Sequence, residues 1–418
     1  MATPIKIVVV GNGFGGVYAL KNLHTRFHKH FGARATELIL IGEKNYFLFT
    51  PLLHEVATGG ISPENIIEPI RKVFGCKLDT FCLGKVERVD LESQSVNVGE
   101  VVISYDYLIL APGAETDFYN IPGAKAHSLP LKSLEDAIGL KNRVIRQMEH
   151  ASHTPNLLER KKNLTFVVVG GGPTGVEIAT ELQELIQQSF SRYYPRELIE
   201  DTSIIVVHNR SELVPQFGEK MRIKSLEFLH KKGIKVMLNT EVKEVSSSGV
   251  VLSNDMRISA ANVIWVAGIK PITIEFEQEV ARNKNGQIIV NDYLQLENHP
   301  EVFVIGDSAA LRDTGMHTVL PMLAQVATKQ ARAVAKNIKR DMESKKQKPF
   351  VYRHTGNLMS LGQWMAVGEI WHVTFWGRFT WWFWRTVYLF KLISFRKKVR
   401  VAFDWTVNIF TPRDISEF

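Results

Sequence analysis

The sequence predicts an α/β protein with two Rossmann-like dinucleotide-binding domains followed by a separate C-terminal region. Two glycine-rich turns support this prediction, because each follows a short apolar run typical of a buried parallel strand. A third observation is an uneven charge: residues 345–418 carry twelve Lys/Arg and four Asp/Glu, which accounts for the whole net charge of +8. Seven of the eight Trp also lie there, between Trp364 and Trp405.

Both turns fit the pattern Gly-x-Gly-x-x-Gly between a strand and a helix. The first Gly makes the turn, the second lets backbone N–H groups approach a pyrophosphate, and the third allows close helix–strand packing. One such pattern is weak evidence. Two of them indicate that one chain holds two dinucleotides and that electrons pass between these. The two turns are Gly11-Asn12-Gly13-Phe14-Gly15-Gly16, after Ile5–Val10, and Gly170-Gly171-Gly172-Pro173-Thr174-Gly175, after Leu164–Val169.

Further elements follow each turn in the order that a βαβ unit requires. We predict helices at Val17–Phe31, 133–161, 175–194, Lys220–Lys232 and Pro321–Met342. We predict strands at Glu37–Ile41, Lys85–Asp90, Ser95–Val98, Leu108–Ala111, Ser203–Val207, Lys235–Leu238, Val263–Val266 and Val302–Ile305. The polar run Lys345–Pro349 is the best domain boundary.

The residues at two strand ends differ in charge. Glu43 ends the second strand of the first unit, where a carboxylate can bind a ribose diol, although such a residue can also be merely solvated. The corresponding strand of the second unit ends in His208-Asn209-Arg210 and lacks the acid. Since basic groups tolerate a 2′-phosphate, NADPH stays open beside NADH.

Two further acids have a functional and a structural interpretation. Glu177 lies in the first turn of the helix predicted after the second glycine turn. It can be an acceptor for a nicotinamide carboxamide or a charge that complements the helix dipole. Asp307 follows an apolar strand, where it can meet the polyol of a flavin or cap a helix.

Cysteine and histidine usage predicts no metal site. Cys76 and Cys82 fit neither a metal spacing nor a redox pair, so we expect buried, inert thiols and a reducing compartment. The 13 His show no ligand spacing. The first strand begins at Ile5, so no secretory leader is expected.

The C-terminal region predicts attachment to an anionic lipid surface rather than a membrane span. Its most apolar stretch, Phe375–Phe395, is interrupted by Arg378, Arg385 and Lys391, which on a helix lie near one stripe opposite Phe and Trp. Packing on the body or in a homodimer is the alternative. Nucleic acid is disfavoured, because the Trp residues follow a helical pattern.

The order of motifs resembles type II NADH:quinone oxidoreductases, flavoproteins with two dinucleotide-binding domains, and the similarity covers essentially the whole chain. The more family-specific parts are Thr50-Pro51-Leu52-Leu53 and Ala324-Gln325-Val326-Ala327. The other motifs that carry it are the two turns, Ala111-Pro112-Gly113, Pro173-Thr174-Gly175-Val176-Glu177, Trp265-Val266-Ala267-Gly268 and Val304-Ile305-Gly306-Asp307.

The resemblance implies an FAD domain, 1–130 and 291–345, split around an NAD(P)H domain, 131–290, with a membrane-surface region at 346–418. It implies Glu177 as the nicotinamide-side acid and Gln325 in the quinone pocket beside the flavin. FAD would bind Gly11, Gly13, Phe14, Gly15, Gly16, Glu43, Thr50, Ala111, Gly113 and Asp307, and the nicotinamide dinucleotide would bind Gly170, Gly172, Pro173, Thr174, Gly175 and Gly268.

Two positions depart from the family pattern. Lys329 stands where the motif Ala-Gln-x-Ala-x-Gln has its last Gln, and Gln330 is next. Family members usually carry Glu where His208 stands.

The resemblance therefore implies a non-pumping NADH:quinone oxidoreductase of the respiratory chain, peripheral on the cytoplasmic face of a bacterial inner membrane. The cofactors carry the hydride and electron chemistry, and the protein positions them. Alternatives are an NAD(P)H reductase of a soluble electron carrier, or a redox-sensing protein that binds FAD and NAD(P)H with little turnover. A sulfide:quinone oxidoreductase would need reactive cysteines by the flavin, which Cys76 and Cys82 are poorly placed to be.

Overall fold

The computed structural model describes residues 4–31, 36–74, 80–312, 319–371 and 373–417. The chain forms two compact units, each assembled from three segments. Unit 1 comprises Met1–Leu48, Ile67–Glu115 and Ile269–His354, and unit 2 comprises Phe49–Ile66, Thr116–Gly268 and Thr355–Phe418.

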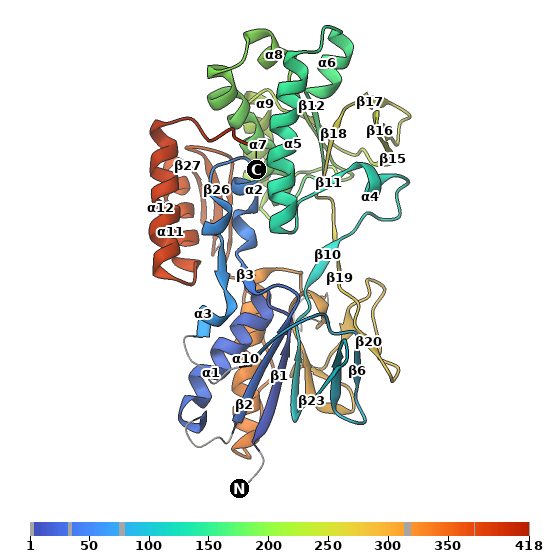
Figure 1. Ribbon diagram of the computed structural model, residues 1–418, viewed down its shortest axis with the longest axis vertical. Coiled ribbons are helices and arrows are strands. Elements are labelled where there is room, and N and C mark those ends of the chain that lie inside the picture. The colour runs from blue at the N-terminus through green and yellow to red at the C-terminus, as the bar shows by residue number, and fades with distance from the viewer. Residues whose placement is uncertain (1–3, 32–35, 75–79, 313–318, 372, 418) are drawn as a thin grey trace. The chain divides into compact units, whose positions relative to one another are not determined.

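Unit 1 is built on a six-stranded sheet of order β22-β23-β9-β1-β2-β5. Its central strand β1 (Ile5–Val10) runs parallel to both neighbours, with Ile5 opposite Thr36 and Ile7 opposite Tyr107. Helices α1 and α10 pack side by side in this unit (Figure 1). Burial of Ile7, Val8 and Val9 makes β1 the core of the unit.

The helices of unit 1 are α1 (Phe14–Phe31), α3 (Ile70–Phe74) and α10 (Ala324–Met342). Its other strands are β2 (Thr36–Gly42), β3 (Tyr46–Leu48), β4 (Ile67–Pro69), β5 (Thr80–Leu83), β6 (Arg88–Asp90), β7 (Ser95–Val98), β8 (Val101–Ser104), β9 (Tyr107–Leu110), β19 (Ile269–Pro271), β20 (Glu275–Phe276), β21 (Ile288–Ile289), β22 (Gln295–Leu296), β23 (His299–Val304) and β24 (Ala309–Ala310). Strand β10 (Ala114–Thr116) ends at the first residue of a unit 2 segment.

Unit 2 repeats the plan with a five-stranded parallel sheet of order β11-β18-β12-β13-β14. Strand β12 (Thr165–Val169) again lies at the centre, with Thr165 opposite Ser203 and Phe166 opposite Asn262. In both units, therefore, the strand before the glycine turn pairs with the next strand of its βαβ unit and with a strand from later in the chain.

The helices of unit 2 are α2 (Leu53–Val56), α4 (Ala124–His127), α5 (Leu134–Ser152), α6 (Leu157–Asn163), α7 (Pro173–Glu184), α8 (Arg196–Asp201), α9 (Glu219–Lys231), α11 (Arg378–Lys391) and α12 (Phe395–Phe410). Its other strands are β11 (Leu129–Pro130), β13 (Ser203–Val207), β14 (Lys235–Met237), β15 (Val242–Ser246), β16 (Gly249–Leu252), β17 (Arg257–Ser259), β18 (Asn262–Trp265), β25 (Asn357–Ser360), β26 (Ala366–Ile370) and β27 (Val373–Gly377).

Most predicted elements are confirmed, and three are wrong in detail. The α-helix expected over 175–194 ends at Glu184 and is followed by a π-helix, Leu185–Ser189, and a 3₁₀ helix, Phe190–Arg192. The helix expected over 133–161 is two helices, because Pro155 lacks a backbone N–H and the Asn156 side chain caps α6 by accepting from the backbone of Leu158 and Glu159. The strand expected over Lys85–Asp90 begins only at Arg88.

The C-terminal region differs most from its prediction. The stretch Phe375–Phe395 is not one helix: it contains the end of β27, all of α11 and the first residue of α12. Strand β27 also forms an antiparallel sheet with β25 and β26, which precede this stretch, and the sequence analysis did not predict that sheet. Helices α11 and α12 lie side by side within unit 2 (Figure 1).

Candidate functional site

The first glycine turn forms an open cradle between β1 and α1. Gly11 has φ +100°, and a Cβ atom there would lie 2.0 Å from the carbonyl oxygen of Ala111. A Cβ at Gly16 would lie 1.7 Å from the oxygen of Gly11. Gly13 has no atom within 4 Å of that position. The protein itself therefore requires Gly11 and Gly16, whereas Gly13 leaves space for a ligand.

The second turn repeats this geometry in unit 2. Gly170 has φ +117°, and its Cβ would lie 2.7 Å from Cα of Ala267. A Cβ at Gly175 would lie 1.8 Å from the oxygen of Gly170, while Gly172 again has nothing within 4 Å. Both cradles open at the N-terminus of a helix, where free N–H groups and the helix dipole favour a phosphate anion.

The remaining residues predicted for the first cradle border it within unit 1. Phe14 is the first residue of α1, and its ring meets Phe47 edge-on at 5.0 Å. A Cβ at Gly15 would lie 3.0 Å from Cβ of Ala111. The backbone N–H of Ala111 donates to the carbonyl of Val10. Gly113 has φ +85° and open space where a Cβ would stand. At Gly13 and Gly113, therefore, no described atom occupies the place where a side chain would begin.

Glu43 and His208 occupy equivalent strand ends. Glu43 is exposed directly after β2, and the Asn12 amide fixes the next residues by donating to the carbonyls of Lys44, at 2.8 Å, and Tyr46, at 2.7 Å. His208 follows β13, and its Nδ1 accepts the backbone N–H of Gly171 at 3.1 Å. The first strand end is anionic, and the second is not.

Asp307 lies in a short 3₁₀ turn, Gly306–Ser308, at the end of β23. Gly306 has φ +71° and donates its backbone N–H to Oε1 of Gln330 at 2.7 Å. The N-cap of this turn is Ile305, so Asp307 is not the helix cap that its sequence context also allowed. Gln330 is 1 % exposed and holds the turn that presents Asp307.

Gln325 and Lys329 stand on the first turns of α10. Gln325 is the second residue of the helix and is half-buried. Lys329 donates to the carbonyl of Arg353 and lies 5.0 Å from the ring of Tyr352, and burial lowers its pKa. Lys329, at the position of the missing Gln, therefore contacts the end of the last segment of unit 1. The side chain of Gln330 instead accepts the backbone N–H of Gly306.

Glu177 lies on the buried face of α7. Its Oε1 accepts the backbone N–H of Ser360 at 3.3 Å, and its Oε2 lies 3.7 Å from Nδ1 of His54. Burial raises the pKa of the Glu177 carboxyl well above its usual value, and Glu181 and Glu55 raise it further. Burial lowers the pKa of His54 to about 4, so at neutral pH the imidazole beside this carboxyl group is neutral.

Two other predicted cofactor residues lie in unit 2. Thr50 begins the 3₁₀ helix Thr50–Leu52 in the segment Phe49–Ile66 that joins this unit. Gly268 follows β18, and a Cβ there would lie 2.0 Å from the hydroxyl of Tyr119. Their contacts with a dinucleotide stay predictions.

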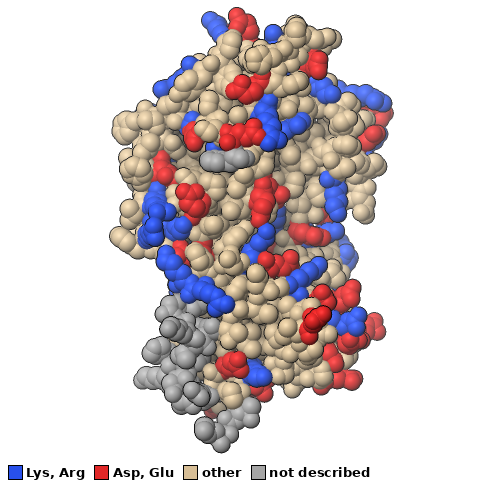
Figure 2. Space-filling model, in the orientation of Figure 1, with Lys and Arg blue, Asp and Glu red and all other residues tan. Residues whose placement is uncertain are grey.

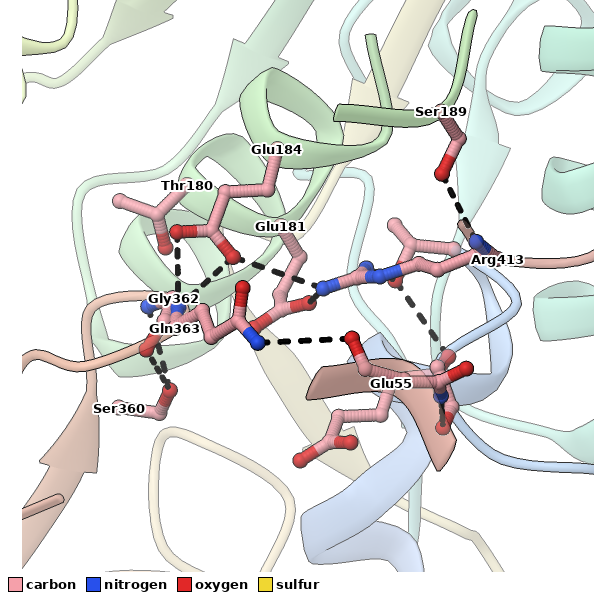
Figure 3. Close-up of polar contacts among 12 residues, drawn as sticks. Glu55, Thr180, Glu181, Glu184, Ser189, Ser360, Gly362, Gln363 and Arg413 are labelled. Atoms are coloured by element: carbon pink, nitrogen blue, oxygen red, sulfur yellow. Dashed lines mark hydrogen bonds and ion pairs between the residues drawn. The ribbon is translucent and has the colours of Figure 1, made fainter. Parts of the chain in front are cut away.

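A buried ionic cluster extends from the same face of α7 to the end of the chain. Nη2 of Arg413 lies 2.6 Å from Glu181 and 3.5 Å from Glu184, and Nη1 donates to Thr58 at 2.9 Å (Figure 3). Glu184 also accepts the backbone N–H of Gln363. The C-terminal segment, the sheet β25–β27 and the segment around α2 are thereby joined to the helix of the second cradle.

The cluster continues through Glu55 and two C-terminal helices. Oε2 of Glu55 accepts the indole N–H of Trp405 at 2.6 Å. Burial and the charge of Glu181 raise the pKa of Glu55 to about 7. Arg385 lies 3.6 Å from the ring centre of Trp381, and burial lowers its pKa to about 10. Arg385 thus faces the interior and does not share a surface stripe with Arg378 and Lys391, contrary to the prediction.

Sequence reasoning missed this cluster because each acid on a helix is normally solvated. The signal that was present is the spacing of Glu177, Glu181 and Glu184, which places all three on one face of α7. Arg413, which pairs with Glu181 and Glu184, is more than 200 residues away in the chain, and no local pattern connects it to these acids.

The outer face of α11 and α12 is apolar. On α12 the exposed side chains Phe395, Val399, Phe403 and Phe410 form one stripe, and Phe403 is 67 % exposed. Helix α11 adds Phe379, Trp382 and Phe390. Figure 2 shows uncharged side chains along the outer edge of this hairpin beside a group of Lys and Arg. None of the described helices has the length and apolar character needed to cross a bilayer.

The two cysteines were predicted to be buried, inert thiols. Cys82 lies on β5 of unit 1 with a free thiol that is half-buried rather than fully buried as predicted. Cys76 falls outside the described residues.

Comparison with known proteins identifies two matching family models. Residues 5–331 match the pyridine nucleotide-disulphide oxidoreductases, and residues 354–414 match the NDH2 C-terminal domain.

The similar proteins share nearly the full length of the chain. A type II NADH:quinone oxidoreductase Ndh of Mycobacterium tuberculosis is 30 % identical, covering 98 % of this chain and 89 % of that protein. A probable NADH dehydrogenase of Dictyostelium discoideum is also 30 % identical, over 99 % and 91 %. The structure of NDH2 from Plasmodium falciparum with NADH superposes with a TM-score of 0.91 at 22 % identity, over 99 % of each chain.

Proposed function

Because the chain belongs to the type II NADH:quinone oxidoreductases, within the pyridine nucleotide-disulphide oxidoreductase family, we propose that it transfers electrons from NADH through bound FAD to a membrane quinone. The reaction consumes NADH, one proton and a quinone, and it yields NAD⁺ and the quinol. The observation that carries this proposal is the pair of glycine cradles, each with one open Gly beside two that the fold itself requires.

FAD fits the cradle of unit 1. Gly13 and Gly113 leave space where any side chain would stand, and the N–H groups at the start of α1 suit a pyrophosphate. Glu43 would accept the hydroxyls of the adenosine ribose, and Asp307 would bind the polyol chain. When bound, FAD supplies an acceptor for a hydride and a donor of two electrons.

Glu177 would orient the nicotinamide. Its oxygens can accept from the carboxamide N–H groups, and the raised pKa favours the protonated carboxyl, which can also donate to the carboxamide oxygen. His54 and the backbone of Ser360 hold the carboxyl in place. Burial favours the uncharged form of this carboxyl because an unpaired buried charge is costly.

The test is a purified protein and one variant. The protein should be yellow, should oxidise NADH with a soluble quinone, and should reduce quinone faster than a ferredoxin. Gln325→Ala should lower kcat/KM for quinone about tenfold more than the anaerobic rate of flavin reduction by NADH. The matched control is Gln188→Ala, an exposed residue away from these sites, which should change neither rate. A colourless protein, or equal loss of both rates in Gln325→Ala, would contradict the assignment.

We further propose that α11 and α12 dock on an anionic lipid surface, on the cytoplasmic face of a bacterial inner membrane. The apolar stripe would enter the interface while Arg396, Lys397 and Arg400 meet lipid phosphates. A variant with Phe395, Phe403 and Phe410 changed to Ser should no longer co-sediment with anionic vesicles but should keep its flavin. Unchanged vesicle binding, or a change from dimer to monomer instead, would assign the face to packing.

A further inference from the structure

The end of β13 in unit 2 has no free carboxylate where a nicotinamide dinucleotide would place its adenosine ribose. The residues after β13 are His208, Asn209, Arg210 and Ser211, and those after β14 are Leu238, Asn239 and Thr240. An acid at this place accepts both ribose hydroxyls and repels a 2′-phosphate. Residues 208–211 and 238–240, all of them described, therefore lack the group that would exclude a phosphorylated ribose.

The nearest acids in sequence are engaged elsewhere. Glu212 forms an ion pair of 2.5 Å with Arg222 on α9. Glu241 lies at the start of the hairpin that contains β15, where its backbone exchanges hydrogen bonds with Ser253. The Glu212 side chain is thus engaged with α9, and the backbone of Glu241 belongs to the hairpin that follows.

His208 is fixed against the second cradle. Its backbone N–H donates to Met237 at 2.8 Å, its carbonyl accepts from Thr240 at 2.9 Å, and its ring accepts from Gly171. The ring is so close that a Cβ at Gly171 would lie 2.7 Å from Cγ of His208. Since Nδ1 is an acceptor, the proton of the neutral ring is on Nε2, which can donate to a ribose or phosphate oxygen.

Arg210 supplies the positive charge at this strand end. Its side chain is exposed, while its carbonyl accepts the backbone N–H of Asn239 at 2.9 Å. The charge reaches its neighbours: burial lowers the pKa of His208 and Arg210 lowers it further, whereas burial raises the pKa of Tyr119 and Arg210 opposes that rise. A guanidinium is a preferred partner of phosphate because it forms charge-assisted, often bidentate hydrogen bonds.

We propose that the second cradle accepts the 2′-phosphate of NADPH, with Arg210 and His208 as the specificity-determining residues, so that the enzyme oxidises NADPH as well as NADH. This inference rests on the proposed binding of a nicotinamide dinucleotide to unit 2. The 2′-phosphate takes no part in the reaction. NADPH loses a hydride and becomes NADP⁺, and the quinone gains that electron pair, the hydride's proton and one proton from water.

Steady-state kinetics with both donors and one soluble quinone test the proposal. The wild-type ratio of kcat/KM for NADPH to that for NADH should lie above about 0.1. Arg210→Ala should lower this ratio about 10- to 100-fold, the range expected for one charge-assisted hydrogen bond. His208→Glu should lower it further by repulsion of the phosphate. Arg196→Ala, an exposed arginine paired with Glu200 on α8, is the control and should leave the ratio as it is.

Binding without turnover separates this proposal from the proposed function. Calorimetry on the holoenzyme should show that 2′-phospho-ADP-ribose binds at least as tightly as ADP-ribose, and that Arg210→Ala weakens only the phosphorylated ligand. A wild-type ratio below about 0.001, or a loss in Arg210→Ala that is equal for both ligands, overturns the 2′-phosphate site while leaving NADH oxidation intact. Failure of either ligand to bind would instead refute a nicotinamide site in unit 2.

Discussion

The two glycine cradles have nearly the same backbone but different strand ends. Gly11 and Gly170 both have positive φ, and Gly16 and Gly175 both meet the carbonyl of the first Gly in their own turn. The next strand is followed directly by Glu43 in unit 1 and by His208 in unit 2. The comparison teaches that the glycine pattern specifies pyrophosphate binding, whereas the strand end specifies what the ribose carries.

The helices that follow the cradles also differ. Helix α1 buries apolar residues such as Leu20 and Leu23 and packs on α10. Helix α7 buries Glu177, Glu181 and Glu184 as well, and these carboxyls require partners from the C-terminal segment. Helix α1 is thus stabilised by apolar packing, and helix α7 also by ionic contacts with the C-terminal segment.

The largest expected effect comes from filling the open Gly of one cradle at a time. Gly13→Val should remove the flavin, because the new side chain occupies ligand space without meeting protein atoms. Gly172→Val should keep the yellow colour and lower kcat/KM for NADH by roughly 100-fold, since a displaced nicotinamide reacts poorly. Absorbance of bound flavin and steady-state rates measure the two losses.

Each of these variants is the control for the other. Loss of flavin in Gly172→Val, or retention of flavin in Gly13→Val, would show that the cradles do not hold separate dinucleotides.

The next largest effect concerns the ionic contacts of α7. Arg413→Met leaves Glu181 and Glu184 buried without their guanidinium, and it should lower the free energy of unfolding by about 3–5 kcal/mol. Arg88→Met in unit 1 breaks the exposed pair with Glu277 and should leave the denaturation midpoint within error. Chemical denaturation followed by Trp fluorescence measures both. Similar midpoints for the two variants would mean that the cluster adds nothing to unit 2.

The smallest effect is a pH dependence that should have opposite signs in the two units. The pKa of Glu55 rises from 4.5 to about 7 on folding, so its contribution is fully present below pH 4.5 and is lost as the pH rises through 7. Wild type should therefore lose on the order of 2–3 kcal/mol relative to Glu55→Gln over this range.

Asp90 of unit 1 gives the contrast. Hydrogen bonds from Ser93 and Gln278 lower its pKa to about 2, so its contribution is present above pH 4 and is lost as the pH falls. Thermal melts of Glu55→Gln and Asp90→Asn from pH 3 to 8 would show this. Parallel pH profiles for the two variants would contradict the assignment.

Local patterns made much of the fold predictable. Apolar runs and glycine turns predict both βαβ units. Strands β7 and β13 lie at the predicted residues. The break between α5 and α6 was missed, although Pro155 and Asn156 mark it. The sheet β25–β27 was missed because its strands are short and lie among aromatic residues that also suit a helix.

The sequence by itself determined the two dinucleotide cradles, because a Gly-x-Gly-x-x-Gly turn depends on contacts within one strand, one turn and one helix. Only the tertiary structure decided which charges are buried. It placed Arg385 among aromatic rings, and it placed Arg413 against the buried acids Glu181 and Glu184. The physical reason is that burial and ion pairing depend on segments far apart in the chain, and no periodicity records their meeting.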